Sequence, residues 1–155
     1  MRQPRTVLVY LFRQETEGPR YAVLQRADDG NWQAVSGGVE GGETFGAAAR
    51  REALEETGLG LGAPLYRLDM TSGAERTCFA AAAHWSPDVY IVVKHFFAMD
   101  VTGQPRDVTL SGEHTAARWA GYAAAYEALR YDDDRTALWE LDARLAAGDL
   151  PAPVA

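Results

Sequence analysis

Three glutamates, Glu52, Glu55 and Glu56, lie within five residues of one another in a stretch whose composition favours a helix. At about 100° per residue, Glu55 and Glu56 fall on either side of Glu52, so the three carboxylates share one narrow face. Hard divalent cations with oxygen ligands, Mg²⁺ in particular, relieve the repulsion within such a cluster. The alternative is a solvated acidic face, where each like-charge pair costs only about 0.2–0.5 kcal/mol.

The segment in front of these glutamates favours the metal site. Residues 36–42 read SGGVEGG, with four glycines in seven positions. Glycine permits positive φ and close backbone approach, so we expect a loop that bends sharply and presents backbone groups to a metal-bound phosphate. An ordinary flexible turn is the alternative interpretation.

The elements around this loop must aim the carboxylates. We expect a helix that begins near Thr44 as its N-cap and ends at Gly58, a residue suited to the left-handed conformation. Ala47 and Leu54 are one heptad apart and are predicted to pack on a sheet. The glutamates would then point outward, toward a ligand.

The whole segment Gly37 to Leu59 matches, at every fixed position, the pattern G-x5-E-x7-R-E-U-x-E-E-x-G-U, where U is apolar. It resembles the Nudix box, the signature of hydrolases that cut diphosphate linkages attached to another moiety. The fixed residues are Gly37, Glu43, Arg51, Glu52, Glu55, Glu56 and Gly58. The resemblance implies an α/β/α sandwich with a mixed β-sheet, and a Glu43–Arg51 pair that braces the loop.

The resemblance also implies roles for the acidic residues. Glu52 and Glu56 would bind Mg²⁺, with Mn²⁺ as the other candidate, and Glu55 would act as a ligand or a base. The carbonyl of Gly37 would be a further metal ligand. Glu113 would add a carboxylate from a loop, as a ligand or as the base; by itself, it also reads as a solvated surface residue.

Matches outside the box are similar to the branch of the family that acts on dihydroneopterin triphosphate in folate synthesis. They are Leu24 to Asp29, Trp32 to Gly37, and Glu113-His114 followed by Trp119. On this basis the substrate contacts would be Arg26 and Ser36, with Arg2 and Asp133 as further candidates on the substrate side. Arg26 has an equal alternative as part of a surface ion pair.

Other activities stay open at this point. Ala74 stands where ADP-ribose enzymes usually carry a proline, and the tyrosine of many dinucleoside polyphosphate enzymes is missing from Glu75-Arg76-Thr77. A pyrophosphatase that sanitises nucleoside triphosphates, or one for dinucleoside polyphosphates, is the alternative enzyme. A catalytically silent Nudix domain that binds a nucleotide is the alternative of another class.

Composition limits the partners and the location. The chain has 155 residues, is 47% apolar and carries a formal charge of −7. This fits one domain over residues 1–155, with 148–155 predicted to be a loose tail. The resemblance implies a small-molecule polyphosphate as the ligand. The negative charge argues against nucleic acid and anionic membranes. Cys78 is alone, so we expect a buried thiol in a reducing, cytoplasmic environment. A monomer and a homodimer fit equally.

The remaining pattern predicts an α/β fold with a mixed sheet flanked by helices. Segments rich in β-branched and aromatic residues are predicted to be strands, and the two late segments to be helices. The strands are Thr6–Phe12, Tyr21–Leu24, Gln33–Val35, Leu65–Met70, Thr77–Ala82, Val89–Met99 and Ala116–Trp119, and the helices are Tyr122–Leu129 and Asp134–Ala146. The polar residues 13–19 are predicted to connect the first hairpin.

Overall fold

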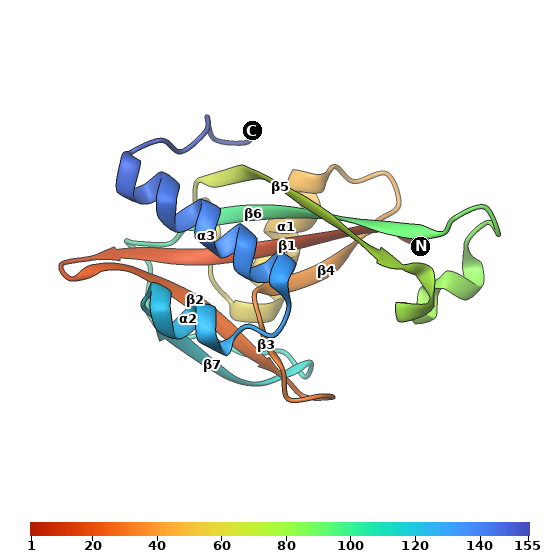
Figure 1. Ribbon diagram of the computed structural model, residues 1–155, viewed down its shortest axis with the longest axis horizontal. Coiled ribbons are helices and arrows are strands. Elements are labelled where there is room, and N and C mark those ends of the chain that lie inside the picture. Colours follow the sequence, from red (N-terminus) through yellow and green to blue (C-terminus); the bar gives the residue numbers. More distant parts are fainter.

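The computed structural model describes all residues from Met1 to Ala155 and shows a mixed sheet with helices on both faces (Figure 1). Its strands are β1 (Arg2–Glu15), β2 (Gly18–Arg26), β3 (Trp32–Gln33), β4 (Val35–Glu40), β5 (Leu65–Glu75), β6 (Ile91–Asp100) and β7 (His114–Ala120). The α-helices are α1 (Phe45–Thr57), α2 (Tyr122–Ala128) and α3 (Asp132–Ala147). Two short 3₁₀ helices, η1 (Arg76–Cys78) and η2 (Ala80–His84), follow β5.

The long strand β1 organises the seven-stranded sheet. Its first half pairs antiparallel with β4, its second half pairs antiparallel with β2, and its other edge pairs parallel with β6. Strand β5 continues the sheet beyond β6, while β3 and β7 both pair with β2. The chain between β2 and β4 therefore passes from the strand that pairs with the second half of β1 to the strand that pairs with its first half.

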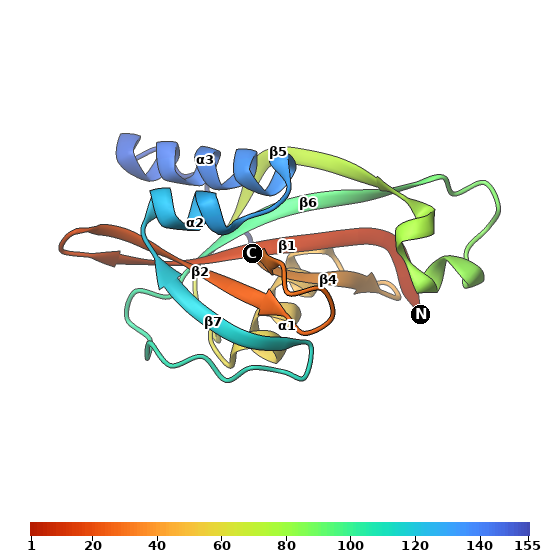
Figure 2. The same cartoon turned by 60° about the horizontal axis from the view of Figure 1, so that its bottom comes forward.

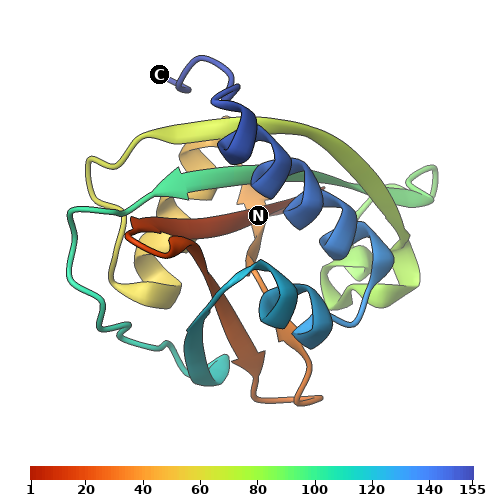
Figure 3. The same cartoon turned by 60° about the vertical axis from the view of Figure 1, so that its left-hand side comes forward.

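The sheet lies between α1 on one face and α2 and α3 on the other, as Figures 2 and 3 show, and an apolar core fills each interface. Helix α1 covers one face through a core that includes Val7 and Val9, and α2 and α3 cover the other through a core that includes Leu8 and Tyr10. Because β1 is buried on both faces, its centre reads as a continuous apolar run instead of an alternating one. The predicted α/β/α sandwich is confirmed. No helix here is both long and apolar enough to cross a bilayer.

Two predictions of local structure are wrong. The polar residues 13–19 are mostly strand, because β1 and β2 pair as far as Glu15 and Gly18 and leave only a tight turn. Residues 77–82, predicted to be extended, instead belong to η1 and η2. Alanine has little preference for strands, and nothing pairs with this segment to hold it extended.

The end of the chain is anchored, so the prediction of a loose tail over 148–155 is wrong. These residues form no helix or strand beyond Gly148, the left-handed cap of α3. However, the Val154 amide donates to the Leu65 carbonyl at 2.7 Å, and Arg50 donates to the Val154 carbonyl at 3.2 Å. The Val154 side chain also packs against the core beneath α1. The tail therefore closes one edge of the sandwich.

Candidate active site

Helix α1 has the predicted boundaries. The Thr44 hydroxyl accepts from the Ala47 amide at 3.1 Å, and Gly58 adopts the left-handed conformation with φ of 71°. The residues that face the sheet differ from the prediction, since Ala47 and Leu54 are exposed while Ala48, Ala49 and Ala53 are buried. Small alanines let the helix lie close to the strands. This turns part of the acidic face inward.

The three glutamates consequently separate into different environments. Glu56 is only 2% exposed, and the side chain of Glu52 is 13% exposed. Glu55 keeps 58% of its side chain in solvent and lies 3.4 Å from Arg51. The prediction of one outward-facing cluster is therefore wrong in its direction: Glu52 and Glu56 point toward strand β4, and Glu55 points away from it.

The glycine-rich segment is a strand more than a loop. Residues 35–40 form β4, and of the glycines in 36–42 only Gly41 has a positive φ, of 47°. Positions 37 and 38 require glycine for a different reason, because neither has room for a Cβ atom in this arrangement. A Cβ at Gly37 would lie 2.0 Å from Cδ of Glu52, and one at Gly38 would lie 2.4 Å from Nε of Arg2. These two glycines let an acidic and a basic side chain lie against the strand.

Arg51 braces this arrangement, in agreement with the predicted pair with Glu43. Its guanidinium reaches the two Glu43 oxygens at 2.6 and 3.2 Å and the Gly38 carbonyl at 2.8 Å. It also donates to Oε1 of Glu52 at 2.7 Å. The hydrogen bonds from Arg51 lower the pKa of Glu43. These contacts tie helix α1 to strand β4 at the point where Glu52 lies against Gly37.

Glu56 is the most electrostatically perturbed of the glutamates. Burial, followed by the negative charges of Glu52 and Glu113, raises the pKa of Glu56 to about 9. The Ser36 amide donates to its Oε2 at 3.3 Å, but its buried Oε1 has no partner. A buried carboxylate with a free oxygen beside two other carboxylates fits a divalent cation.

The ligand set is not closed in this arrangement. No three His, Cys, Asp or Glu side chains converge as a complete metal site. Arg51 donates to one oxygen of Glu52, Oε1. The donor chemistry of Glu52 and Glu56 fits a metal.

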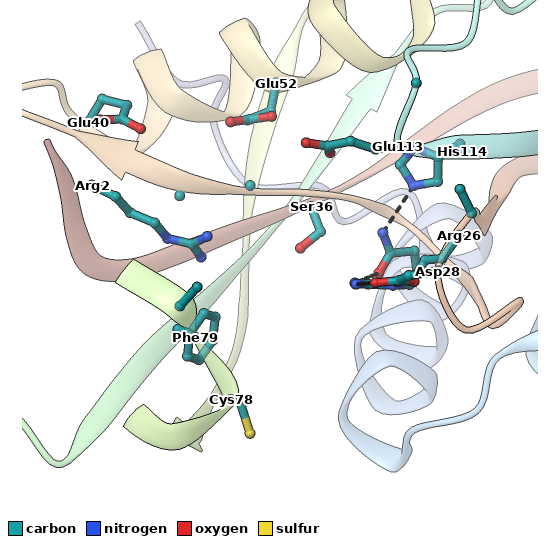
Figure 4. Close-up of a pocket in the computed structure, with 16 residues that line it drawn as sticks. Arg2, Arg26, Asp28, Ser36, Glu40, Glu52, Cys78, Phe79, Glu113 and His114 are labelled. Atoms are coloured by element: carbon teal, nitrogen blue, oxygen red, sulfur yellow. Dashed lines mark hydrogen bonds and ion pairs between the residues drawn. The ribbon is translucent and has the colours of Figure 1, made fainter. Parts of the chain in front are cut away.

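Glu113 reaches the same region from the loop before β7. Its backbone carbonyl accepts from the Ala27 amide at 2.9 Å, which ties the loop to the end of β2. The adjacent His114 is buried, and its Nε2 lies 3.1 Å from Nε2 of Gln33. Burial lowers the pKa of His114, which keeps the ring neutral near pH 7. The Glu113 side chain itself is exposed and faces Glu52 across the pocket (Figure 4).

Arg26 is held in an ion pair at the other end of the pocket. It donates to both oxygens of Asp28, at 2.9 and 2.5 Å, and to Oε1 of Gln33 at 3.4 Å. Both interpretations of Arg26 are therefore compatible with its position, because the paired guanidinium still lines the cavity. Any phosphate contact would compete with Asp28.

These residues surround a cavity of about 640 Å³. Of the predicted site residues, it brings together Arg2, Arg26, Ser36, Gly37, Glu52 and Glu113. Glu56 lies behind Ser36, Glu55 lies in solvent, and Asp133 is absent from the lining. Asp133 instead accepts from Lys94 at 2.6 Å and from Ser72 at 2.8 Å. Its predicted place on the substrate side does not agree with this position.

Two lining residues were missed or misassigned from the sequence. Phe79 lines the cavity, and Cys78 is exposed at the same wall, so the prediction of a buried thiol is wrong. Both follow Arg76 at the junction of η1 and η2. No local pattern distinguishes them, because the segment reads only as an alanine-rich stretch with scattered aromatics.

Comparisons with known proteins place these observations in a family. The NUDIX domain model matches residues 2–140. Dihydroneopterin triphosphate diphosphatase of Escherichia coli K12 is 31% identical over 140 residues, which cover 88% of this chain and 91% of the relative.

Solved structures agree. The crystal structure of a chain described as a NUDIX hydrolase from Listeria monocytogenes superposes with a TM-score of 0.86 and 36% identity, over 97% of this chain and 99% of that one. The structure of the E. coli dihydroneopterin triphosphate pyrophosphohydrolase superposes with a TM-score of 0.75 and 29% identity, over 92% and 97% of the two chains.

Proposed function

The chain belongs to the Nudix family of hydrolases, which act on phosphoanhydride bonds, and on this premise we propose that its substrate is dihydroneopterin triphosphate. The products would be the monophosphate and inorganic pyrophosphate. The observation that carries this choice of substrate is the 31% identity to the E. coli diphosphatase across 91% of that relative's length. The acidic pocket with arginines at its two ends supports a polyphosphate ligand.

Mg²⁺ is the proposed cofactor, with Mn²⁺ as the alternative. Glu52, Glu56 and the Gly37 carbonyl would hold it, and a further ligand role for Glu113 is the alternative to its role as the base. When bound, such a cation would neutralise phosphate charge and lower the pKa of a water molecule. The support is the unpartnered buried oxygen of Glu56 beside two carboxylates, which is unfavourable without a positive charge.

Glu113 is the proposed base for the attacking water. It is exposed on the pocket lining and forms no ion pair, so its carboxylate is free to accept a proton. Glu55 is the alternative base, but it lies 3.4 Å from Arg51 and does not line the pocket. A base must reach the proton it removes, and position therefore favours Glu113.

Arg2, Arg26 and Ser36 are the proposed substrate contacts. Arginine forks suit phosphate oxygens, and the two guanidinium groups lie toward opposite ends of the cavity with Ser36 between them (Figure 4). Asp133 is left out of this set because its carboxylate is bound to Lys94 and Ser72. The lone free thiol of Cys78 fits a reducing compartment, and we infer a cytoplasmic location.

A substrate panel tests the proposal. Dihydroneopterin triphosphate should give a higher kcat/KM than dATP, 8-oxo-dGTP and a dinucleoside polyphosphate, with pyrophosphate as the released product. A tenfold preference for one of the nucleotides would move the assignment to a sanitising or dinucleoside polyphosphate enzyme. Release of orthophosphate alone would rule out cleavage between the α and β phosphates. Binding without any turnover would identify a silent nucleotide-binding domain.

A further inference from the structure

The segment Arg76–Trp85 forms the wall of the pocket that lies opposite helix α1. It contributes Phe79 and Cys78 to the lining, and Figure 4 shows Phe79 beneath the guanidinium of Arg2. The roles proposed above for the glutamates and arginines leave two aromatic residues of this wall, Phe79 and Trp85, without a function. Their contacts converge on a single neighbour, Arg2.

The wall is held in a fixed shape by its own first residue. The Arg76 guanidinium donates to the carbonyls of Ser86, Val89 and Ala82, at 2.9, 2.7 and 2.7 Å. These charge-assisted hydrogen bonds close the segment on itself without a strand partner. The wall therefore offers a preorganised surface to whatever packs on it.

Arg2 is fixed from several directions. Its guanidinium carbon lies 4.9 Å from the centre of the Phe79 ring, and its backbone carbonyl accepts from Nε1 of Trp85 at 2.8 Å. Its Nη2 donates to the Thr6 hydroxyl at 3.0 Å, and its stem lies against Gly38, where a Cβ would clash. This many contacts on one long side chain reduce the entropy lost when it binds a ligand.

The guanidinium is nevertheless without an anionic partner. Arg2 forms no ion pair with any carboxylate of the chain, and its buried Nε has no hydrogen-bond acceptor. It faces Glu52 and Glu113 across the cavity. A fixed arginine with unused donors, opposite a carboxylate cluster suited to a cation, fits an anion that bridges the two.

We propose that Phe79 and Trp85 are positioning residues that hold Arg2 in place to bind the diphosphate part of the substrate, the part that leaves as pyrophosphate. This inference rests on the proposed function for the identity of the anion. Phe79 acts through the face of the guanidinium, and Trp85 acts through the backbone of Arg2. Neither ring needs to touch the substrate.

A double-mutant cycle on binding of inorganic pyrophosphate, measured by calorimetry in the presence of Mg²⁺, tests the proposal. Arg2→Ala should weaken binding on the order of thirtyfold, as expected for lost charged hydrogen bonds. Phe79→Leu should weaken it about fivefold, the equivalent of one cation–π contact. In the Arg2→Ala background, Phe79→Leu should cause no further loss, because its effect passes through Arg2.

Controls separate positioning from simple destabilisation. Phe79→Tyr, which keeps the aromatic ring, should bind as tightly as the unmodified protein. Trp85→Phe removes the Nε1 donor to Arg2 and part of the ring whose centre lies 6.1 Å from that of Phe79, and it should weaken binding. Tyr126→Leu removes an arginine stack of similar geometry outside the pocket, with Arg135 at 5.2 Å, and should leave binding unchanged. Thermal unfolding of each variant checks the fold.

Two results would overturn the proposal: a full fivefold loss from Phe79→Leu in the Arg2→Ala background, or no loss in the wild-type background. The first would mean that Phe79 contacts the ligand directly. A different substrate from the panel would leave the cycle intact, because any phosphoanhydride substrate carries the probed group. Failure of this inference and failure of the proposed function are therefore distinguishable.

Discussion

Two carboxylate clusters in this molecule each contain one buried member, and they differ in whether a lysine of the chain lies among them. The pocket cluster consists of Glu52, Glu56 and Glu113 beside β4. The α3 cluster consists of Asp133 and Asp134 at the start of α3, together with Lys94 on β6 and Ser72 on β5. Each contains a carboxylate that burial drives toward the protonated state, Glu56 in one and Asp134 in the other.

The α3 cluster takes a positive charge from within the chain. Lys94 lies 2.6 Å from Asp133 and 3.9 Å from Asp134. Although burial opposes ionisation, the hydrogen bonds from Lys94 and Ser72 lower the pKa of Asp133 below its usual range. The only lysine in the chain is used here to fasten α3 to the sheet.

The pocket cluster has no such internal lysine, and it opens to a cavity. Arg51 reaches Glu52, but the buried Oε1 of Glu56 has no partner. Asp134 in the α3 cluster also has a buried Oδ1 without a hydrogen-bond partner, but it lies 3.9 Å from Lys94 and away from the cavity. An unpartnered carboxylate beside a cavity indicates a ligand, whereas one beside an internal lysine does not require one. By this criterion Asp133 has a structural role and Glu56 a functional one, although in the sequence both look like acidic residues on the surface of a helix.

The largest expected effect is on catalysis at the pocket cluster. Glu56→Gln should lower kcat about 10³-fold at saturating Mg²⁺, because it removes a charge that would hold the metal. Its free energy of unfolding without metal should stay equal or rise at pH 7, because the raised pKa of Glu56 makes the native state take up a proton that the unfolded chain does not hold. Steady-state kinetics and urea unfolding measure the two quantities. Wild-type turnover would contradict the metal role and end the contrast with the α3 cluster.

Glu113→Gln should lower kcat about 10²-fold with little change in KM, as expected for loss of a base that acts in the transition state. The isosteric amide retains the loop, whose contact to Ala27 is made by the backbone. The matched control is Asp133→Asn, which should have the kcat and KM of the unmodified protein at a temperature where the variant is folded. Equal loss of activity in both variants would remove the functional distinction between the clusters.

The α3 cluster should show its effect in stability against pH. Burial, opposed by Lys94 and increased by the charge of Asp133, raises the pKa of Asp134 to about 6, above the unfolded value of about 3.9. The native state binds the Asp134 proton more tightly than the unfolded chain does. The contribution of this proton to the free energy of unfolding is therefore complete below pH about 4 and is lost as the pH rises through about 6.

Asp134→Asn should remove this loss, which is on the order of 2 kcal/mol. Urea unfolding of both proteins between pH 4 and 8 should give a stability difference that grows in favour of the variant as pH rises. The other titratable groups in contact with this residue are Lys94, Asp133 and Tyr10, whose hydroxyl donates to the Asp134 carbonyl at 2.7 Å. A pH-independent difference would show that Asp134 is ionised throughout.

The smallest expected effect is the stabilisation by metal. Mg²⁺ at ten times its Kd should raise the free energy of unfolding by about 1.4 kcal/mol. Lys94→Met should retain this increment, while the Glu52→Gln/Glu56→Gln double variant should lose it. Thermal unfolding with and without a chelator provides the measurement. An increment that survives in the double variant would place the ion elsewhere.

Much of the site was predictable from the sequence because its signals are local. The spacing of Gly37, Glu52 and Glu56 predicted that a glycine-rich segment and a helix form one unit, and the cap residues Thr44 and Gly58 predicted the helix ends. The same spacing did not predict that the glycine-rich segment is strand β4. Helical periodicity and end chemistry involve residues a few positions apart, so a single sequence carries them. The same holds for the order of strand and helix segments that predicted an α/β fold with a mixed sheet, whereas the α/β/α sandwich was implied by the resemblance to the Nudix family.

The tertiary structure alone decided which of these residues face each other. Glu55 and Glu56 are neighbours in sequence, yet one lies in solvent and the other is buried, because the alanines beneath α1 set its rotation against the sheet. Phe79 meets Arg2 across 77 positions of chain, and Asp133 meets Lys94 across 39. Such contacts depend on strand order and on close packing between layers, for which no residue spacing gives a signal.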